Sequence, residues 1–291
     1  MREWTDTHLH LLEPEHLHYD WTADFAPLQG RFGWERYAAQ AQVLGITRVL
    51  HMEVDVRESQ MEAESDFIAA LAQTTEQPRI VGLIAPCRPE HADFPTYVAR
   101  QKAQRPLVRG FRRVLHTQAD ELSQQAGFAQ HVAQLGAQGY SYDLCVAARQ
   151  LPLALALARQ APQTNIVLDH CGVPDVAGQG LDPWRQQLRE LAALPHVHCK
   201  ISGVIAYGRA ADWTDLPSIA RDLRPFVEHA IDCFGWDRVV WGSDWPVCEV
   251  TRHLSDWMGV TQLLLQGCSG DEIDRLAHRN AQRIYRLEAE A

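Results

Sequence analysis

The chain has 291 residues, 46% of them hydrophobic, and carries a formal net charge of −10 at pH 7 with an isoelectric point near 5.7. This size allows a large buried core, and the acidic balance argues against nucleic acid as a partner. The amino terminus has no secretory signal pattern, and no apolar run is long enough to span a membrane. We therefore expect a cytoplasmic protein without a membrane partner. The seven cysteines occur without any C-x-x-C pair, which predicts reduced thiols.

Short apolar segments alternate with longer segments of helical periodicity along the whole chain. The predicted strands are, in order, Thr5–Leu11, Thr47–Val54, Ile80–Cys87, Val108–Val114, Tyr140–Val146, Asn165–Gly172, Val197–Gly203 and Arg238–Asp244. Helical periodicity occurs between them, for example over residues 34–45, 62–73, 128–139, 150–161, 183–194 and 219–235. Gly45, Gly139 and Gly235 follow three of the predicted helices, at the position where a helix commonly ends in a left-handed residue.

This alternation predicts parallel strands joined by right-handed crossovers. Two α/β folds satisfy it, a closed (β/α)8 TIM barrel and an open doubly wound sheet. The open sheet usually carries a G-x-G-x-x-G turn after an early strand, and the sequence has none. Eight units in about 250 residues fit the barrel. We predict a single-domain (β/α)8 TIM barrel over residues 1–291.

The first predicted strand carries three polar side chains on alternate positions. Asp6, His8 and His10 would share one strand face, each roughly 6.6 Å from the next. A buried strand face normally carries Val, Ile or Leu. Two histidines on such a face therefore indicate the beginning of a functional site.

Ionisable residues also end most of the other predicted strands. The catalytic groups of a (β/α)8 barrel lie at the carboxyl ends of its strands, so these residues predict a charged cavity mouth. Alternation places Arg112 on the face of Gly110 and turns Arg113 to the other face, unless the register slips by one residue. The candidate site residues are His8, His10, Glu53, Arg112, Tyr142, Asp143, His170, Lys200 and Asp244.

This set of side chains allows two routes to the attack of water on an acyl carbon. Neutral imidazoles and a carboxylate can hold a divalent metal with an open position. Without metal, Asp244 can take a proton from a water oriented by the histidines. Arg112 and Lys200 would bind a substrate carboxylate or stabilise the developing oxyanion.

Five motifs together resemble the amidohydrolase-2 branch of the amidohydrolase superfamily, and they extend from the first strand to the last helix. They are D-x-H-x-H at Asp6–His10, G-F-R at Gly110–Arg112, D-H-C-G at Asp169–Gly172, G-S-D-W-P at Gly242–Pro246 and the closing segment Asn280–Leu287. The resemblance implies a lactonase of sugar lactones or of pyrone-dicarboxylate and muconolactone types, with decarboxylases among its relatives. It implies that Asp244 activates water, that Arg112 binds the substrate, and that three histidines hold metal or the lactone: His8, His10 and His170.

The sequence departs from two-metal members of the superfamily at the fourth and fifth strands. Arg112, and Tyr142 with Asp143, stand where those enzymes carry a bridging ligand and a histidine. One divalent metal, zinc first, or no metal is therefore expected. The ligands would be His8, His10, His170 and Asp244, and Glu53 could complete the set.

Other polar residues have simpler interpretations. Asp169 has the opposite strand parity to His170 and is expected to orient a neighbour rather than to bind metal. The remaining histidines, His116 among them, are expected to be surface or structural residues. Cys87, Cys145 and Cys171 lie near strand ends, but no basic partner is evident for any of them. Trp21, Trp34, Trp213 and Trp245 could stack on a ring-shaped substrate or pack in the core.

We therefore hypothesise a hydrolase that opens a small carboxylated or hydroxylated lactone with water activated by Asp244. The substrate-binding residues would be Arg112, Tyr142, Asp143, Lys200 and Glu53. The last four could instead form a structural ion pair or hydrogen bond at the barrel rim. One alternative is a metal-dependent non-oxidative decarboxylase on the same barrel. Another is a barrel that binds a small molecule without turning it over. The identity of the lactone and a homo-oligomeric state stay open.

Overall fold

Eight parallel strands form a barrel, and each strand is followed in the chain by a helix. The computed structural model describes residues 2–23 and 25–287. The strands pair in the order β1-β2-β3-β4-β5-β6-β7-β8. Their bounds are β1 Trp4–Leu9, β2 Ile46–Met52, β3 Arg79–Pro86, β4 Val108–Val114, β5 Ser141–Cys145, β6 Asn165–Leu168, β7 Val197–Ile201 and β8 Val239–Trp241. The predicted (β/α)8 barrel is confirmed.

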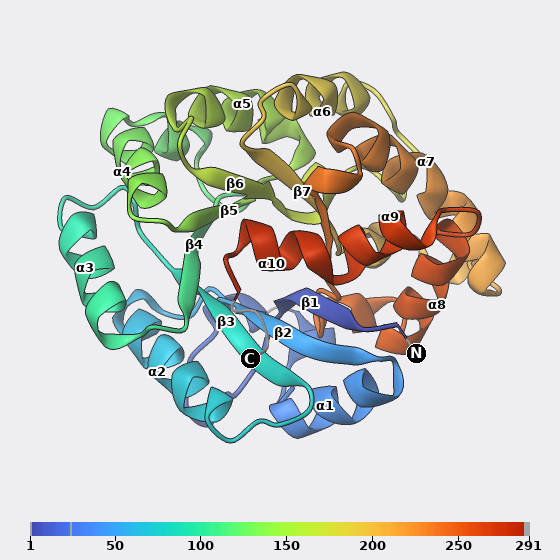
Figure 1. Ribbon diagram of the computed structural model, residues 1–291, viewed down its shortest axis with the longest axis horizontal. Coiled ribbons are helices and arrows are strands. Elements are labelled where there is room, and N and C mark those ends of the chain that lie inside the picture. Colours follow the sequence, from blue (N-terminus) through green and yellow to red (C-terminus); the bar gives the residue numbers. More distant parts are fainter. Residues whose placement is uncertain (1, 24, 288–291) are drawn as a thin grey trace.

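Helices surround this barrel and cover its outer face (Figure 1). The helices of this outer layer are α1 Trp34–Val43, α2 Met61–Ala72, α3 Phe94–Gln104, α4 Ala126–Ala137, α5 Leu151–Gln160, α6 Trp184–Ala192, α7 Leu216–Phe234 and α8 Leu254–Leu264. Two short helices, α9 Gly270–Asp274 and α10 Asn280–Ile284, come after them in the chain. Gly45, Gly139 and Gly235 have φ of +77°, +87° and +69°. These values confirm the predicted left-handed residues before three of the strands.

All eight predicted strands exist, but β6 and β8 end three or four residues earlier than predicted. After Leu168 the chain turns, and His170 and Cys171 have φ of +55° and +54°. After Trp241 it turns again, with φ of +57° at Asp244. A left-handed residue cannot continue a strand, so these polar residues lie on turns at the barrel mouth.

The hydrophobic core has two parts. The larger part fills the space between the strands and the helices, for example around Tyr37, Phe128 and Phe226. The smaller part fills the barrel interior with Leu50, Met52, Ile84, Val167 and Val240. Ala281, Ile284, Tyr285 and Leu287 pack against this interior cluster, and α10 lies across the middle of the barrel in Figure 1. The amino ends of the strands are therefore closed by α10.

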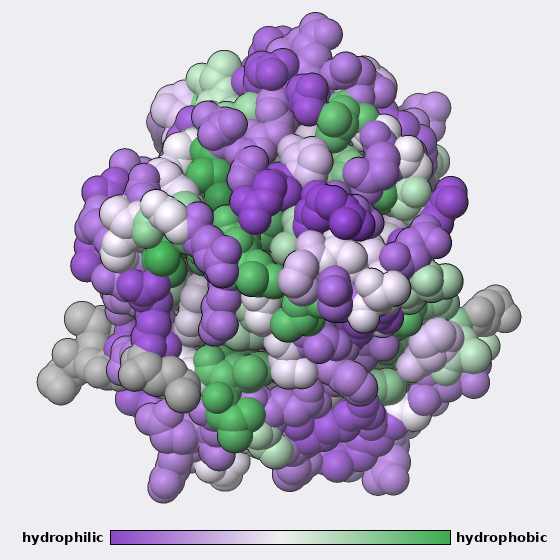
Figure 2. Space-filling model, turned by 90° about the vertical axis from the view of Figure 1, so that its right-hand side faces the viewer, coloured by the Kyte–Doolittle hydropathy of each residue, from purple (hydrophilic) through white to green (hydrophobic). Residues whose placement is uncertain are grey.

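The outer surface is mainly hydrophilic. On the flank that carries α7 and α8, hydrophobic residues form scattered patches between hydrophilic ones (Figure 2). Within residues 2–23 and 25–287, no helix combines the length and the apolar character that a membrane crossing requires. All seven cysteines are unpaired thiols.

Candidate active site

The ends of β1 and β8 meet at the carboxyl end of the barrel. The amide of Asp244 donates to the carbonyl of His8 at 2.9 Å, and the amide of His10 donates to the carbonyl of Trp245 at 2.8 Å. Asp244 and His170 both have positive φ. Such a conformation costs about 1–3 kcal/mol in a non-glycine residue and is typical of functional sites. The sheet closure thus brings Asp244 next to the histidines of the first strand.

Three of the four predicted metal ligands form one compact group. His8, His170 and Asp244 each offer a ligand atom within 4.8 Å of the others, and all three are buried. Oδ1 of Asp244 lies 3.6 Å from Nε2 of His8, and Oδ2 lies 3.9 Å from Nδ1 of His170. His10 lies beside this group, with Nε2 3.1 Å from His8 Nε2 and Nδ1 3.0 Å from the carbonyl of Met52.

Two features indicate that this group fits a divalent cation. Oδ2 of Asp244 is buried and has no hydrogen-bond partner within the described residues, and such an atom is costly unless a ligand contacts it. Gly203 flanks the group: a Cβ there would lie 2.4 Å from Nδ1 of His170 and 2.9 Å from Oδ2 of Asp244. The glycine therefore keeps open the space next to both side chains. Imidazole and carboxylate are ordinary zinc ligands.

Burial sets the protonation of the group. It lowers the pKa of His8 well below 6.5, that of His10 to about 3, and that of His170 as well. Burial raises the pKa of Asp244 to about 6. Neutral imidazoles are the form that binds metal. A carboxylate whose pKa is near neutrality is suited to accept a proton from water.

Arg112 enters the site from β4 on the predicted face. Its Nε donates to Oε1 of Glu53 at 2.6 Å, its Nη2 donates to the Glu53 carbonyl at 2.6 Å, and its Nη1 lies 3.3 Å from Nε2 of His8. Oε2 of Glu53 accepts from the amide of Asp55. Both carboxylate oxygens of Glu53 are thus used by the protein, so we leave Glu53 out of the metal-ligand set. Its contacts hold Arg112 in place.

Lys200 and Asp143 lie inside the barrel and are fully buried. Nζ of Lys200 lies 2.6 Å from Oδ1 of Asp143, 3.0 Å from Oδ1 of Asp169 and 3.1 Å from Nδ1 of His8. The hydroxyl of Tyr285, which follows α10, donates to the same Asp143 oxygen at 2.7 Å. These side chains support His8 and do not reach the cavity. Neither Asp143 nor Lys200 is among the residues that line the cavity, so we leave both out of the proposed substrate-binding residues.

Tyr142 also lies outside the site. Asp143 points into the barrel, so its neighbour on the strand points outward, and the Tyr142 ring packs edge-on against Phe128 of α4. We therefore leave Tyr142 out of the substrate-binding residues. Asp6 has a structural role: it accepts from the amides of His8 and Ser243 and from the hydroxyl of Tyr37.

A cavity of about 600 Å³ opens above the group. Trp21 and Phe25 are partly exposed at its wall, and Tyr207 belongs to the segment that follows β7. Trp34, Trp213 and Trp245 are buried instead, so Trp21 is the one of the four named tryptophans that could stack on a substrate. The lining consists of His10, Trp21, Phe25, Val54, Asp55, Arg112, Val114, His116, Thr117, Cys145, Ala147, His170, Val173, Tyr207, Asp244 and Val247.

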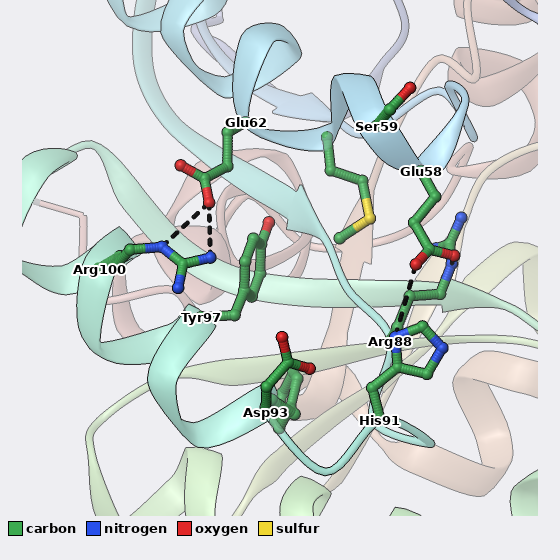
Figure 3. Close-up of a pocket in the computed structure, with 10 residues that line it drawn as sticks. Glu58, Ser59, Glu62, Arg88, His91, Asp93, Tyr97 and Arg100 are labelled. Carbon is green, nitrogen blue, oxygen red and sulfur yellow. Dashed lines mark hydrogen bonds and ion pairs between the residues drawn. The ribbon is translucent and has the colours of Figure 1, made fainter.

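A second, smaller hollow of about 270 Å³ is charged but internally paired (Figure 3). Arg100 of α3 contacts Glu62 of α2 at 2.8 Å, and Arg88 and His91 each lie 3.5 Å from Glu58. Because its cations already contact carboxylates, this hollow offers no unpaired cation among the described residues to an anionic ligand. The cavity at the barrel mouth is the better candidate.

Three residues near the site were not among the predicted site residues. Asp169 contacts Lys200, His8 and Arg112, as expected of a residue that orients its neighbours. His116 is exposed and lies on the wall of the cavity. Tyr207 lies edge-on to His170 with ring centroids 6.1 Å apart. The position of His116 two residues after β4 was a signal that could have identified it.

The family profile described as amidohydrolase matches residues 5–287. The chain belongs to the amidohydrolase family. It is 33% identical over 204 residues to an L-fucono-1,5-lactonase of Burkholderia ambifaria, covering 67% of each chain. It is 43% identical over 190 residues to an L-fucono-1,5-lactonase of Burkholderia multivorans, covering 62% of this chain and 63% of that one. The aligned segments thus span about two thirds of the length of these relatives.

The fold also matches a solved amidohydrolase of Burkholderia multivorans with bound zinc. The TM-score is 0.87 at 28% sequence identity, covering 99% of this chain and 100% of that chain. The family predicted from the five motifs is confirmed, and the chain is an amidohydrolase-family enzyme.

Proposed function

We propose that this enzyme hydrolyses the ring ester of an uncharged, hydroxylated lactone of the sugar-acid type. The observation that carries the proposal is the buried Asp244 carboxylate, which has a free oxygen and lies between His8 and His170 beside a ligand-sized cavity. The similarity to two L-fucono-1,5-lactonases supports the substrate class.

The charges around the cavity favour an uncharged substrate. Arg112 and Lys200 contact three carboxyl groups, those of Glu53, Asp143 and Asp169. His8 lies between Arg112 and a fourth carboxyl group, that of Asp244. When all four are ionised, two cations face four carboxylates, which leaves an excess of two negative charges. Two donors of Arg112 are already used by Glu53. Without a bound cation, a carboxylated lactone, or the carboxylate substrate of a decarboxylase, would meet this excess of like charge, whereas a divalent cation at Asp244 would neutralise it. We favour hydroxylated over carboxylated lactones and hydrolysis over decarboxylation mainly because of the similarity to the two L-fucono-1,5-lactonases.

Asp244 would move the proton that the reaction requires. Its carboxylate accepts a proton from water while the water oxygen bonds to the lactone carbonyl carbon. The negative charge that develops on the carbonyl oxygen is stabilised by Arg112, which lines the same cavity. The ring C–O bond then breaks, and protonated Asp244 returns the proton to the leaving alkoxide. The product is the open-chain hydroxy acid.

His8, His170 and Asp244 would hold one divalent cation, and zinc is the first candidate because a similar amidohydrolase structure contains it. A zinc ion bound by these residues would act as a Lewis acid towards the substrate. The excess of negative charge among the buried side chains around His8 would also stabilise the bound cation.

A screen that compares uncharged lactones with carboxylated compounds tests this proposal. Purified enzyme, with its zinc content measured, is assayed with a pH indicator against sugar 1,5-lactones, muconolactone-type lactones and aromatic carboxylates. We expect acid release from sugar lactones and much slower release from carboxylated ones. Carbon dioxide release from the aromatic acids would contradict hydrolysis. Inactivity on every compound would instead favour a barrel that only binds its ligand.

A further inference from the structure

A histidine and a cysteine face each other on the cavity wall, outside the group around Asp244. Cys145 is the last residue of β5, and His116 lies two residues beyond the end of β4. Val114 pairs with Cys145 in the sheet register. Nδ1 of His116 lies 3.2 Å from Sγ of Cys145, and both residues line the cavity. The sheet thus fixes this pair at the barrel mouth.

The pair determines which ring nitrogen of His116 carries the proton. Burial raises the pKa of Cys145, so the group stays a thiol with a hydrogen to donate. Desolvation on the cavity wall and the charge of Arg112 lower the pKa of His116, which favours the neutral imidazole. An imidazole nitrogen is a better acceptor than sulfur, so the thiol donates to Nδ1 and the proton lies on Nε2. The thiol is therefore not a nucleophile but an orienting donor.

The His116 side chain is exposed, and its Nε2 has no protein partner within the described residues. Nε2 is therefore accessible to a ligand in the cavity. Much of the surrounding wall is apolar and includes Val114, Ala147 and Val173. A donor on a largely apolar stretch of wall favours a ligand that places an oxygen against it and disfavours a ligand without that oxygen. The N–H of His116 therefore has the properties of a specificity contact.

We propose that His116, oriented by the thiol of Cys145, donates a hydrogen bond from Nε2 to one hydroxyl oxygen of the lactone and thereby selects a hydroxylated substrate. This inference rests on the proposed lactone hydrolysis. It gives His116 a role in substrate selection and Cys145 a positioning role, and neither residue takes part in the proton transfer at Asp244.

The test compares a sugar 1,5-lactone with analogues that each lack one ring hydroxyl. In the wild-type enzyme, we expect removal of one particular hydroxyl to lower kcat/KM at least tenfold, mainly through KM. His116→Leu, which cannot donate, should reduce this gap to about twofold. His116→Gln, whose amide can donate, should retain part of the gap.

Cys145 is tested with the same substrate pair. Cys145→Ser keeps a donor to Nδ1 and should preserve the gap, whereas Cys145→Ala removes the donor and should narrow it. A merely structural role would change the two substrates equally, so the ratio of their kcat/KM values is the deciding quantity. Thermal midpoints close to the wild-type value confirm that the variants are folded.

The outcomes separate this inference from the proposed function. If the wild-type enzyme hydrolyses the lactones but His116→Leu leaves every ratio unchanged, the inference is wrong and lactone hydrolysis stands. If the wild-type enzyme hydrolyses no lactone, the proposed function fails and this inference fails with it.

Discussion

Gly203 lies against the side chain of Asp244, so close that a Cβ on the glycine would be 2.9 Å from Oδ2. The same Cβ would lie 2.4 Å from Nδ1 of His170. Gly203 also has a φ of +67°, which side-chain-bearing residues rarely adopt. The open space beside the carboxylate therefore depends on this one residue.

We predict that Gly203→Ala weakens zinc binding and lowers kcat/KM by about 100-fold, because His170 or Asp244 must move away. Zinc affinity is measured by competition with a chelator, and activity with a sugar lactone. Gly127→Ala is the matched control, since a Cβ at that position in α4 meets no atom within 4 Å. Wild-type zinc affinity in Gly203→Ala would contradict the proposed cation site.

Glu53 and Arg112 form a buried ion pair with a distance of 2.6 Å between Oε1 and Nε. Arg112→Met would leave Glu53 charged and unpaired, so we expect a loss of about 3–5 kcal/mol in the free energy of unfolding, measured with urea. The double variant Glu53→Gln/Arg112→Met should recover much of this loss. Its activity should stay low because the positive charge in the cavity is gone. Normal activity of either variant would contradict the role of Arg112.

Two buried tyrosines provide a matched pair. The hydroxyl of Tyr285 donates to Asp143, whereas the hydroxyl of Tyr142 is buried without a partner in the described part of the chain. Tyr285→Phe should therefore cost about 1–3 kcal/mol of stability, and Tyr142→Phe should cost nothing or stabilise the protein. Both variants should keep the wild-type KM, since neither residue lines the cavity. A raised KM for Tyr142→Phe would restore Tyr142 as a substrate-binding residue.

The raised pKa of Asp244 predicts a pH dependence of zinc binding. Burial raises this pKa to about 6 from an ordinary value of 3.8. In the metal-free protein, the folded state thus holds a proton that the unfolded state has lost between pH 4 and 6, and the contribution of Asp244 to stability falls as the pH rises through this range. Zinc must displace that proton below pH 6.

We therefore expect the zinc-induced increase in Tm to be small at pH 5 and to grow above pH 6, as measured by calorimetry with and without zinc. Asp244→Asn cannot titrate and should lose this pH-dependent part of the increase. An equal zinc effect at pH 5 and pH 7 in the wild-type protein would show that the pKa of Asp244 is not raised.

The sequence predicted the barrel and the face of β4 correctly because both depend on local periodicity. Alternation turned Arg112 inward and Arg113 outward, where Arg113 contacts Glu90. The same rule failed after Leu168, because left-handed residues at His170 and Cys171 break the alternation. As a result, both Asp169 and His170 contact the site.

Depth within the barrel was the other feature that the sequence did not reveal. Asp143 and Lys200 are on the correct strand face, but they lie one layer below the cavity and contact Tyr285 from the carboxyl-terminal segment. Likewise, His116 is exposed, as expected of a surface residue, but only the sheet register reveals that it lies beside Cys145 on the cavity wall. Contacts between segments far apart in the chain determine these roles, and no local pattern encodes them.

The central claim is that Asp244 transfers the proton in the hydrolysis of an uncharged lactone. Its most direct test is the kcat/KM of Asp244→Asn with the best sugar 1,5-lactone, in protein whose zinc content and thermal midpoint are measured in parallel. We predict a loss of at least 1,000-fold with the fold retained. An Asp244→Asn enzyme within tenfold of wild-type activity would contradict the account.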